Sequence, residues 1–158
     1  MYCDEFYMQL AIQEAELAFE QGEVPIGAVL VNEDGVIVSK THNLVETLND
    51  PTAHAEMLAV KDAVKIFGRS LTNLTIYVTM EPCPMCAGAL VLSKIKRLVY
   101  AVPDSKAGAS ESLFNITSNY HLNHRLEVTA GVLENRAREL LKSFFKIRRD
   151  INHGRKQT

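Results

Sequence analysis

The stretch from residue 52 to residue 87 constrains the chain more than any other part of its sequence. It begins with a His-x-Glu motif, His54 and Glu56, and ends with a Cys-x-x-Cys motif, Cys83 and Cys86; an amphipathic segment and an apolar run lie between them. Structural zinc sites are closed by four protein ligands, whereas catalytic sites use three and leave one position for water, which the metal acidifies. His54 and the two cysteines supply the three protein ligands of a catalytic site, so the stretch predicts a catalytic zinc site.

The cysteine pair fits a metal site better than a redox site. Cys83 and Cys86 are three residues apart, so both sulfur atoms are expected on one face of a first helical turn. A helix N-terminus also favours the thiolate, which is the form that binds metal. A redox Cys-x-x-Cys is the rival interpretation; the Pro-Met pair between the cysteines and the presence of His54 argue against it.

The position of His54 raises a geometric question, because residues i and i+2 of a regular helix point about 200° apart. His54 and Glu56 can share a site only if His54 lies at or before the first helical residue. Pro51 and Thr52 place the helix start near this point, since residues before proline avoid helix and threonine is a common N-cap. Alone, such a histidine is more often a hydrogen-bonded structural residue. Its co-occurrence with the cysteines favours a ligand, and Glu56 could then carry a proton from attacking water to a leaving group.

The apolar pattern predicts an alternation of helices and strands. We expect a helix capped by Asp4, strands at 24–31 and 36–38, a helix after Pro51, a strand at 74–80, a helix from Pro84, a strand at 97–101, a loop with one helical turn at 103–123, a strand at 126–130 and a helix from about Glu134. Pro25 and Gly27 predict an edge strand or a close approach by another group. This order predicts an α/β fold in which helices cover both faces of a mixed sheet.

Composition narrows the class of protein. The 158 residues are 47% hydrophobic and 23% charged, which suits one globular domain over residues 1–158. The longest uncharged run is far shorter than the roughly 20 apolar residues of a membrane span. Three cysteines favour a reducing compartment such as the cytoplasm over a disulfide framework, and we expect Cys3 to pack as a small apolar residue.

Charge is distributed unevenly along the chain. The net charge is -2, but the first 40 residues hold eight acidic residues and one lysine. Basic residues gather near the C-terminus: Lys142, Lys146, Arg148, Arg149, Arg155 and Lys156. Such a helix could contact nucleic acid phosphates, or it could be a solvated face that ends in a frayed tail at 152–158.

The two motifs also identify a family. His54-x-Glu56 followed by Pro82-Cys83-x-x-Cys86 resembles the signature of the zinc-dependent cytidine deaminase superfamily. The sequence is most similar to the bacterial tRNA adenosine deaminases of that superfamily. That similarity extends over the segments 23–31, 50–56, 77–89, 104–108, 123–125 and 144–149.

The resemblance implies a three-layer fold with a five-stranded mixed sheet, one Zn²⁺ per subunit held by His54, Cys83 and Cys86, and Glu56 as the proton shuttle. It implies deamination of adenosine to inosine at the wobble position of tRNA by a cytoplasmic homodimer that binds the anticodon stem-loop. It also implies substrate contacts from Asn43 and Ile26 at the base, and from Asp104, Lys106, Asn123, Phe144, Phe145, Arg148 and Arg149 at the RNA. Glu111 departs from the family pattern, which often has glycine there.

Two other functions remain open from the sequence. A free-base or nucleoside deaminase, for guanine or cytosine, would share the same metal site and differ in the C-terminal segment. A zinc-bound RNA-binding domain without catalysis would not need Glu56. The basic segment from Phe144 to Arg149 favours an RNA substrate over a free base.

Overall fold

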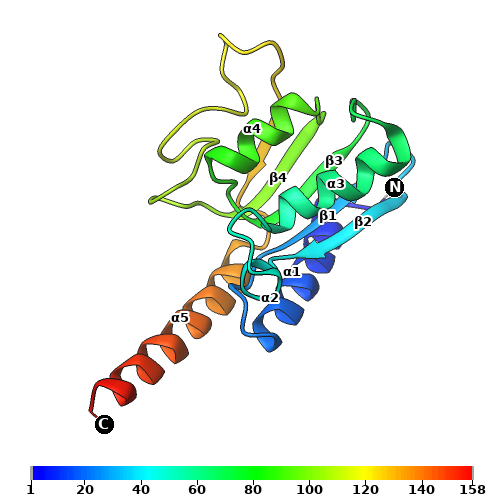
Figure 1. The fold of residues 1–158 in the computed structure, drawn as a ribbon. Coiled ribbons are helices and arrows are strands. Elements are labelled where there is room, and N and C mark those ends of the chain that lie inside the picture. The colour runs from blue at the N-terminus through cyan, green and yellow to red at the C-terminus, as the bar shows by residue number, and fades with distance from the viewer. Residues whose placement is uncertain (1, 158) are drawn as a thin grey trace.

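The computed structural model describes residues 2–157, and it confirms an α/β fold with helices on both faces of one mixed sheet (Figure 1). The elements in chain order are α1 (Asp4–Glu20), β1 (Gly27–Val31), β2 (Ile37–His42), α2 (Val45–Leu48), α3 (Ala55–Phe67), β3 (Thr75–Met80), α4 (Pro84–Leu92), β4 (Arg97–Val102), β5 (Glu127–Ala130) and α5 (Glu134–Lys156). None of the helices in this described part combines the length and the apolar character that a membrane span requires.

The five strands lie in the order β2-β1-β3-β4-β5. β1 is antiparallel to both of its neighbours, whereas β3, β4 and β5 run parallel to one another. The C-terminal ends of β2, β3 and β4 therefore lie at the same end of the sheet, along the border that crosses the strands at His42, Met80 and Val102. We call this the site edge, because α3 and α4 both begin there.

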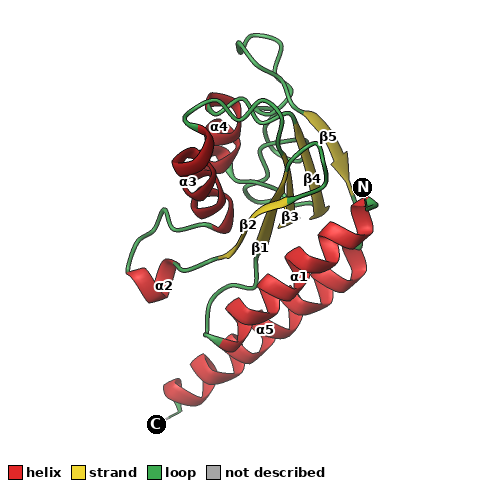
Figure 2. Ribbon diagram, turned by 90° about the vertical axis from the view of Figure 1, so that its right-hand side faces the viewer, coloured by secondary structure: helices red, strands yellow, loops and turns green. Residues whose placement is uncertain are grey.

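Alternation along the strands divides the core into two layers. Ile76 and Leu98 pack with the residues of α3 and α4, and their neighbours Tyr77 and Val99 pack with those of α1 and α5. Figure 2 shows α1 and α5 side by side on one face of the sheet, with α3 and α4 on the other. Because both faces are covered, all five positions of β1 are buried, which explains why this strand is a continuous apolar run in the sequence.

Helix α1 passes very close to β1 at Gly27. A Cβ atom at this position would lie 2.0 Å from the backbone oxygen of Ala11 and 2.6 Å from the backbone nitrogen of Ala15. Only glycine, which has no Cβ, allows this approach. The close approach that the sequence predicts at Gly27 is therefore confirmed, and the approaching group is a helix backbone.

The start of α1 is tied to the sheet by a partly buried ion pair. Asp4 accepts hydrogen bonds of 2.7 Å from both terminal nitrogens of Arg97 and one of 2.9 Å from the Tyr77 hydroxyl. Asp4 is the first residue of α1, and Cys3 occupies the N-cap position. Cys3 is exposed, so the predictions that it packs inside and that Asp4 caps the helix are both wrong.

Several element boundaries differ from the sequence prediction. β1 begins at Gly27, beyond Pro25, and β2 continues to His42 because that residue pairs with Gly27 across the hairpin. Residues 103–126 form turns in place of the expected helical turn. The segment predicted to fray from residue 152 is helical as far as Lys156.

Candidate active site

Three side chains with metal-binding atoms come together at the site edge. The Nδ1 atom of His54 lies 3.5 Å from the Sγ atom of Cys83 and 3.5 Å from that of Cys86. All three ligand atoms lie within 4.8 Å of one another. His54 precedes α3, and the cysteines stand at the start of α4. The N-termini of two neighbouring helices therefore supply the whole cluster.

The local backbone explains how these residues can face one point. His54 is the N-cap of α3 and has an extended conformation, φ -72° and ψ 151°. Its side chain therefore points in a direction that a residue inside the helix could not adopt. This confirms the condition under which His54 and Glu56 can share a site, although the cap lies two residues beyond Thr52. Cys83 is likewise the extended N-cap of α4, where Pro84 at the first position needs no N–H partner. Neither N-cap side chain makes a capping hydrogen bond to its own helix.

Protons are distributed unevenly within the cluster. A hydrogen bond from Cys86 lowers the pKa of Cys83 to about 4 against the effect of partial burial, and His54 acts in the same direction. That hydrogen bond and burial both raise the pKa of Cys86. The hydrogen bond to Cys83 raises the pKa of His54. Of the two thiols, that of Cys83 therefore ionises more readily, and metal binding requires the thiolate form of both cysteines.

This donor set fits zinc. One imidazole nitrogen and two thiolates are ligand types that zinc prefers, and three protein ligands are one fewer than a closed structural site uses. His54 and Cys83 also line a cavity, so the open side of the cluster faces a space that water and substrate can enter. The residues present could thus hold a zinc ion with one coordination position left free.

Glu56 lies in the wall of the same cavity, in the first turn of α3. Its side chain is buried, with 4% exposure. Burial raises the pKa of Glu56, although its contacts with Cys86 and His54 partly oppose the rise. A carboxyl group with a raised pKa holds a proton more readily and can pass it on, as a general acid and base must.

The cavity has a volume of about 340 Å³, within the usual range for sites that bind small molecules or a single base. Its walls come from segments that are far apart in the sequence. Besides the metal cluster and Glu56, its lining includes Glu23, Val24, Ile26, Asn43, Val45, Glu46, Met80, Glu81, Asp104 and Ala107. These ten residues are half apolar and half polar, and two of the predicted substrate residues, Asn43 and Ile26, are among them.

Asn43 is buried but only weakly bonded through its side chain. Its backbone N–H donates to the Ile26 carbonyl at 3.0 Å, which fixes the residue beside the cavity. The side-chain amide makes only long contacts, 3.5 Å to the Val24 carbonyl and 3.4 Å from the Val45 N–H. The amide therefore retains hydrogen-bonding capacity for a ligand in the cavity.

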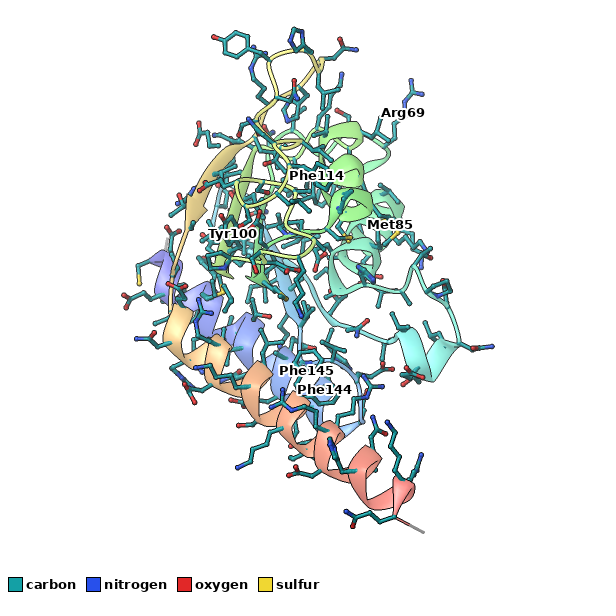
Figure 3. All side chains as sticks on the ribbon, turned by 90° about the vertical axis from the view of Figure 1, so that its left-hand side faces the viewer. Arg69, Met85, Tyr100, Phe114, Phe144 and Phe145 are labelled. Atoms are coloured by element: carbon teal, nitrogen blue, oxygen red, sulfur yellow. The ribbon has the colours of Figure 1, made fainter. Side chains whose placement is uncertain are left out.

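A second and larger groove adjoins the cavity along α5. The two spaces share Met80 and Asp104, and the groove has a volume of about 770 Å³. Most of its charged lining is basic, and it includes the exposed ring of Phe145 (Figure 3). The basic side chains are Lys106, Arg138, Lys142, Lys146 and Arg149. A cationic groove with an exposed aromatic ring has the character of a site for single-stranded nucleic acid.

Three of the residues predicted for RNA contact do not line this groove. Phe144 is buried and stacks edge-on against Phe19 of α1, with ring centroids 5.7 Å apart. Arg148 lies over the Phe144 ring and pairs with Glu46 at 3.5 Å. Asn123 lies just before β5, at the edge of the sheet opposite the site edge. The structure therefore brings Asp104, Lys106, Phe145 and Arg149 together, and it leaves Phe144 inside and Asn123 apart.

Two buried acidic residues in the cavity wall were not singled out from the sequence. Glu23 accepts hydrogen bonds from the backbone N–H groups of Glu46 and Thr47, at 3.0 and 2.7 Å, and so holds the start of α2. Glu81 binds the loop after β4 in a similar way. Neither residue lies in a pattern with a recognised chemical role, and their partners lie more than 20 residues away along the chain.

Comparison with known proteins agrees with this fold and site. The cytidine and deoxycytidylate deaminase zinc-binding region matches residues 1–102. A five-stranded sheet with a His-Cys-Cys cluster at two helix N-termini defines the chain as a zinc-binding deaminase of this superfamily. The similarity continues beyond the zinc-binding region. The chain is 49% identical to the tRNA-specific adenosine deaminase of Bacillus subtilis, over 90% of this chain and 89% of that protein.

The corresponding protein of Aquifex aeolicus is 50% identical over 90% of this chain and 93% of its own length. A solved structure from work on A-to-I editing by tRNA:A34 deaminases superposes with a TM-score of 0.82; it is 41% identical and covers 86% of this chain and 99% of its own. The chain belongs to the tRNA-specific adenosine deaminase family. The family resemblance found in the sequence is thereby confirmed.

Proposed function

We propose that this chain catalyses the zinc-dependent hydrolytic deamination of adenosine to inosine at the wobble position of tRNA. The observation that carries the proposal is the open His-Cys-Cys cluster beside Glu56, in a cavity that continues into a basic groove. The similarity to tRNA-specific adenosine deaminases over most of the chain supports the choice of substrate. Residues 1–158 would then act as one deaminase domain.

His54, Cys83 and Cys86 are the proposed zinc ligands, and each offers one donor atom to the same point. Bound there, zinc would lower the pKa of a water molecule and so provide a nucleophile at neutral pH. The raised pKa of Glu56 suits it to take up one proton of that water. The water oxygen would bond to C6 of adenine while Glu56 passes that proton to the ring nitrogen beside C6. Glu56 would then take the second proton, from the hydroxyl now on C6, and deliver it to the amino nitrogen, so that the C6–N bond breaks and ammonia leaves.

The cavity orients the base for this attack. Asn43 presents a buried amide with free hydrogen-bonding capacity, and Ile26 with Val24 and Met80 provides apolar walls for the ring. At about 340 Å³ the cavity suits one base, so the adenosine would have to leave the stack of the anticodon loop.

The anticodon loop would lie in the groove beside α5. Asp104, Lys106, Phe145 and Arg149 are the proposed contacts, because they line this groove where it meets the cavity. Arg148 adds positive charge beside this groove, and its guanidinium group packs over the ring of the buried Phe144. Asn123, at the opposite edge of the sheet, is left out of this set. We also propose, from the resemblance to the family, that two subunits associate as a homodimer in the cytoplasm.

Incubation with an anticodon stem-loop that carries adenosine at the wobble position tests the function, with free adenine, guanine, cytosine and cytidine in parallel. Inosine should form in the RNA, and the free compounds should remain unchanged. Deamination of a free base without reaction in the RNA would support the alternative, a free-base or nucleoside deaminase.

The variant Glu56→Ala tests the mechanism. It should retain zinc and its melting temperature but lose turnover by about 10²-fold to 10⁴-fold, the usual contribution of a positioned acid and base. Glu16→Ala, an exposed position on α1, is the matched control and should keep full activity. Undiminished activity in Glu56→Ala would refute the assigned role.

A further inference from the structure

One buried carboxylate, that of Glu81, holds a whole loop in place. Glu81 is 3% exposed and stands between the end of β3 and Cys83. Its Oε2 atom accepts backbone N–H groups from three consecutive residues at 3.0 Å each: Ser110, Glu111 and Ser112. Its Oε1 atom accepts the N–H of Asp104 at 3.1 Å and the hydroxyl of Ser112. Residues 104–112 thus close around one side chain, and we call them the Glu81 loop.

The fit between this loop and the carboxylate is tight. A Cβ atom at Gly108 would lie 2.4 Å from the carboxyl carbon of Glu81 and 2.4 Å from the backbone oxygen of Asp104. The loop also donates the N–H of Ala109 to the carbonyl of Pro82 at 2.8 Å. It therefore rests directly on the connection between β3 and α4, which carries Cys83.

The Glu81 loop supplies part of both spaces at the site edge. Asp104 and Ala107 line the cavity, and Asp104 and Lys106 line the basic groove along α5. Glu81 itself lies in the cavity wall. A single residue thus joins the segment that carries a metal-binding cysteine to the loop that would meet the RNA.

We propose that Glu81 is a positioning residue for substrate binding, which fixes the Glu81 loop relative to the metal cluster so that the loop is ordered before RNA arrives. The proposal rests on the proposed function, because it assigns the loop to the anticodon stem-loop. Glu81 acts through the loop and does not touch the reacting atoms. A loop that is already ordered loses less conformational entropy when it binds, so its anchoring strengthens affinity.

The bonds that the loop makes to itself do not replace this anchor. The N–H of Lys106 donates to the Asp104 carboxylate at 3.0 Å, and the N–H of Leu113 donates to the Gly108 carbonyl at 2.9 Å. These contacts preserve turns within the loop but do not reach the β3–α4 connection. The Ala109–Pro82 bond would still hold the middle of the loop. Without the carboxylate, the N–H groups of residues 110–112 would lack their acceptor, and this part of the loop would move toward water to satisfy them.

The variant Glu81→Gln tests the proposal, because an amide offers one acceptor oxygen and an NH₂ group that would face N–H donors. Hydrogen exchange measures protection of the backbone amides of residues 104 and 110–112. Fluorescence anisotropy measures the affinity for the wobble-adenosine stem-loop, in a Glu56→Ala background that prevents turnover. Glu81→Gln should lose the amide protection and bind RNA about tenfold more weakly at unchanged zinc content. Glu33→Gln, an exposed residue paired with Lys96, is the matched control and should change neither.

Retained protection of these amides, or lost protection with unchanged RNA affinity, would overturn the proposal. If Glu81→Gln fails to fold or to hold zinc, the variant Ser112→Ala tests the proposal in its place. It removes the hydroxyl that donates to the Glu81 carboxylate and leaves the bonds from the backbone N–H groups intact. It should weaken protection and affinity by a few fold, and no change in either would count against the anchor. If the unaltered chain neither binds nor deaminates the stem-loop, the proposed function fails and takes the role in substrate binding with it. The exchange measurement still decides whether Glu81 orders the loop.

Discussion

The ion pair at the start of α1 gives a prediction whose size follows from the structure. Asp4 accepts three hydrogen bonds, two from the Arg97 guanidinium at 2.7 Å and one from the Tyr77 hydroxyl at 2.9 Å. In Asp4→Asn the side chain keeps one acceptor oxygen and turns an NH₂ group toward a guanidinium, which can only donate. At least one of the two charge-assisted bonds is therefore lost.

Hydrogen bonds to charged groups contribute about 1.5–3 kcal/mol each. The side chains of Arg97 and Asp4 are 26% and 31% exposed, so water screens the pair in part and the lower half of that range applies. We expect Asp4→Asn to lower the free energy of unfolding by about 2 kcal/mol at pH 7. For a chain of this length, that change lowers the melting temperature by roughly 4–8 °C.

The effect should depend on pH with a definite sign. The hydrogen bond from Arg97 lowers the pKa of Asp4 in the folded state, against the effect of burial. A carboxyl group whose folded pKa lies below its unfolded value, about 3.9, contributes its stability above that value. The contribution disappears as the pH falls through the folded pKa. The difference between Asp4→Asn and the unaltered protein should therefore be full at pH 6–7 and shrink toward zero below about pH 4.

Thermal unfolding followed by circular dichroism, at pH values from 3 to 7, measures both parts of this prediction. The matched control is Glu33→Gln, which removes one partner of the exposed Lys96–Glu33 ion pair and should cost less than about 0.5 kcal/mol. Equal melting temperatures for Asp4→Asn and the unaltered protein at pH 7 would refute the reasoning. So would a difference that grows as the pH falls.

Two further predictions concern packing and metal. Gly27→Ala should lower the free energy of unfolding by about 3 kcal/mol or more, because the new methyl group would meet the backbone of α1 at Ala11 and Ala15. Urea unfolding measures this change. A loss below about 0.5 kcal/mol would show that α1 shifts freely. Removal of zinc with a chelator should lower the melting temperature, and added Zn²⁺ should restore it in proportion to the logarithm of its free concentration, with about 4 kcal/mol regained at 1,000 times the dissociation constant. A melting temperature indifferent to zinc would contradict the assignment of His54, Cys83 and Cys86 as ligands.

Much of the fold could be predicted because its signals are local. Pro51 and the extended conformation required of His54 together indicate where α3 begins, and Pro84 indicates where α4 begins; both positions are close to those in the structure. Features that depend on distant partners could not be predicted in this way. Helix α2 is bound through Glu23, more than 20 residues earlier, and Asp4 turns away from its helix terminus to reach Arg97.

The same distinction between local signals and distant partners applies to the candidate site. Residue type and spacing are enough to bring together His54, Cys83 and Cys86, since each sits at or near the first turn of a helix at one edge of the sheet. The surrounding walls depend on the order of the strands, which the sequence pattern does not reveal. The family resemblance implies RNA contacts for Phe144 and Asn123, but the Phe144 ring is part of the α1–α5 interface, and Asn123 lies across the sheet from the other residues of that set.

The two N-cap positions have a consequence for any attempt to stabilise this protein. Serine, threonine, aspartate and asparagine are the residues that best cap a helix, and each typically stabilises it by about 1 kcal/mol relative to alanine. Positions 54 and 83 instead carry a histidine and a cysteine whose side chains leave their helices uncapped. Engineering that optimised stability alone would replace both residues and remove two of the three metal-binding side chains. Helices α3 and α4 therefore begin with residues suited to the reaction, and their weak starts are a trade-off between stability and activity.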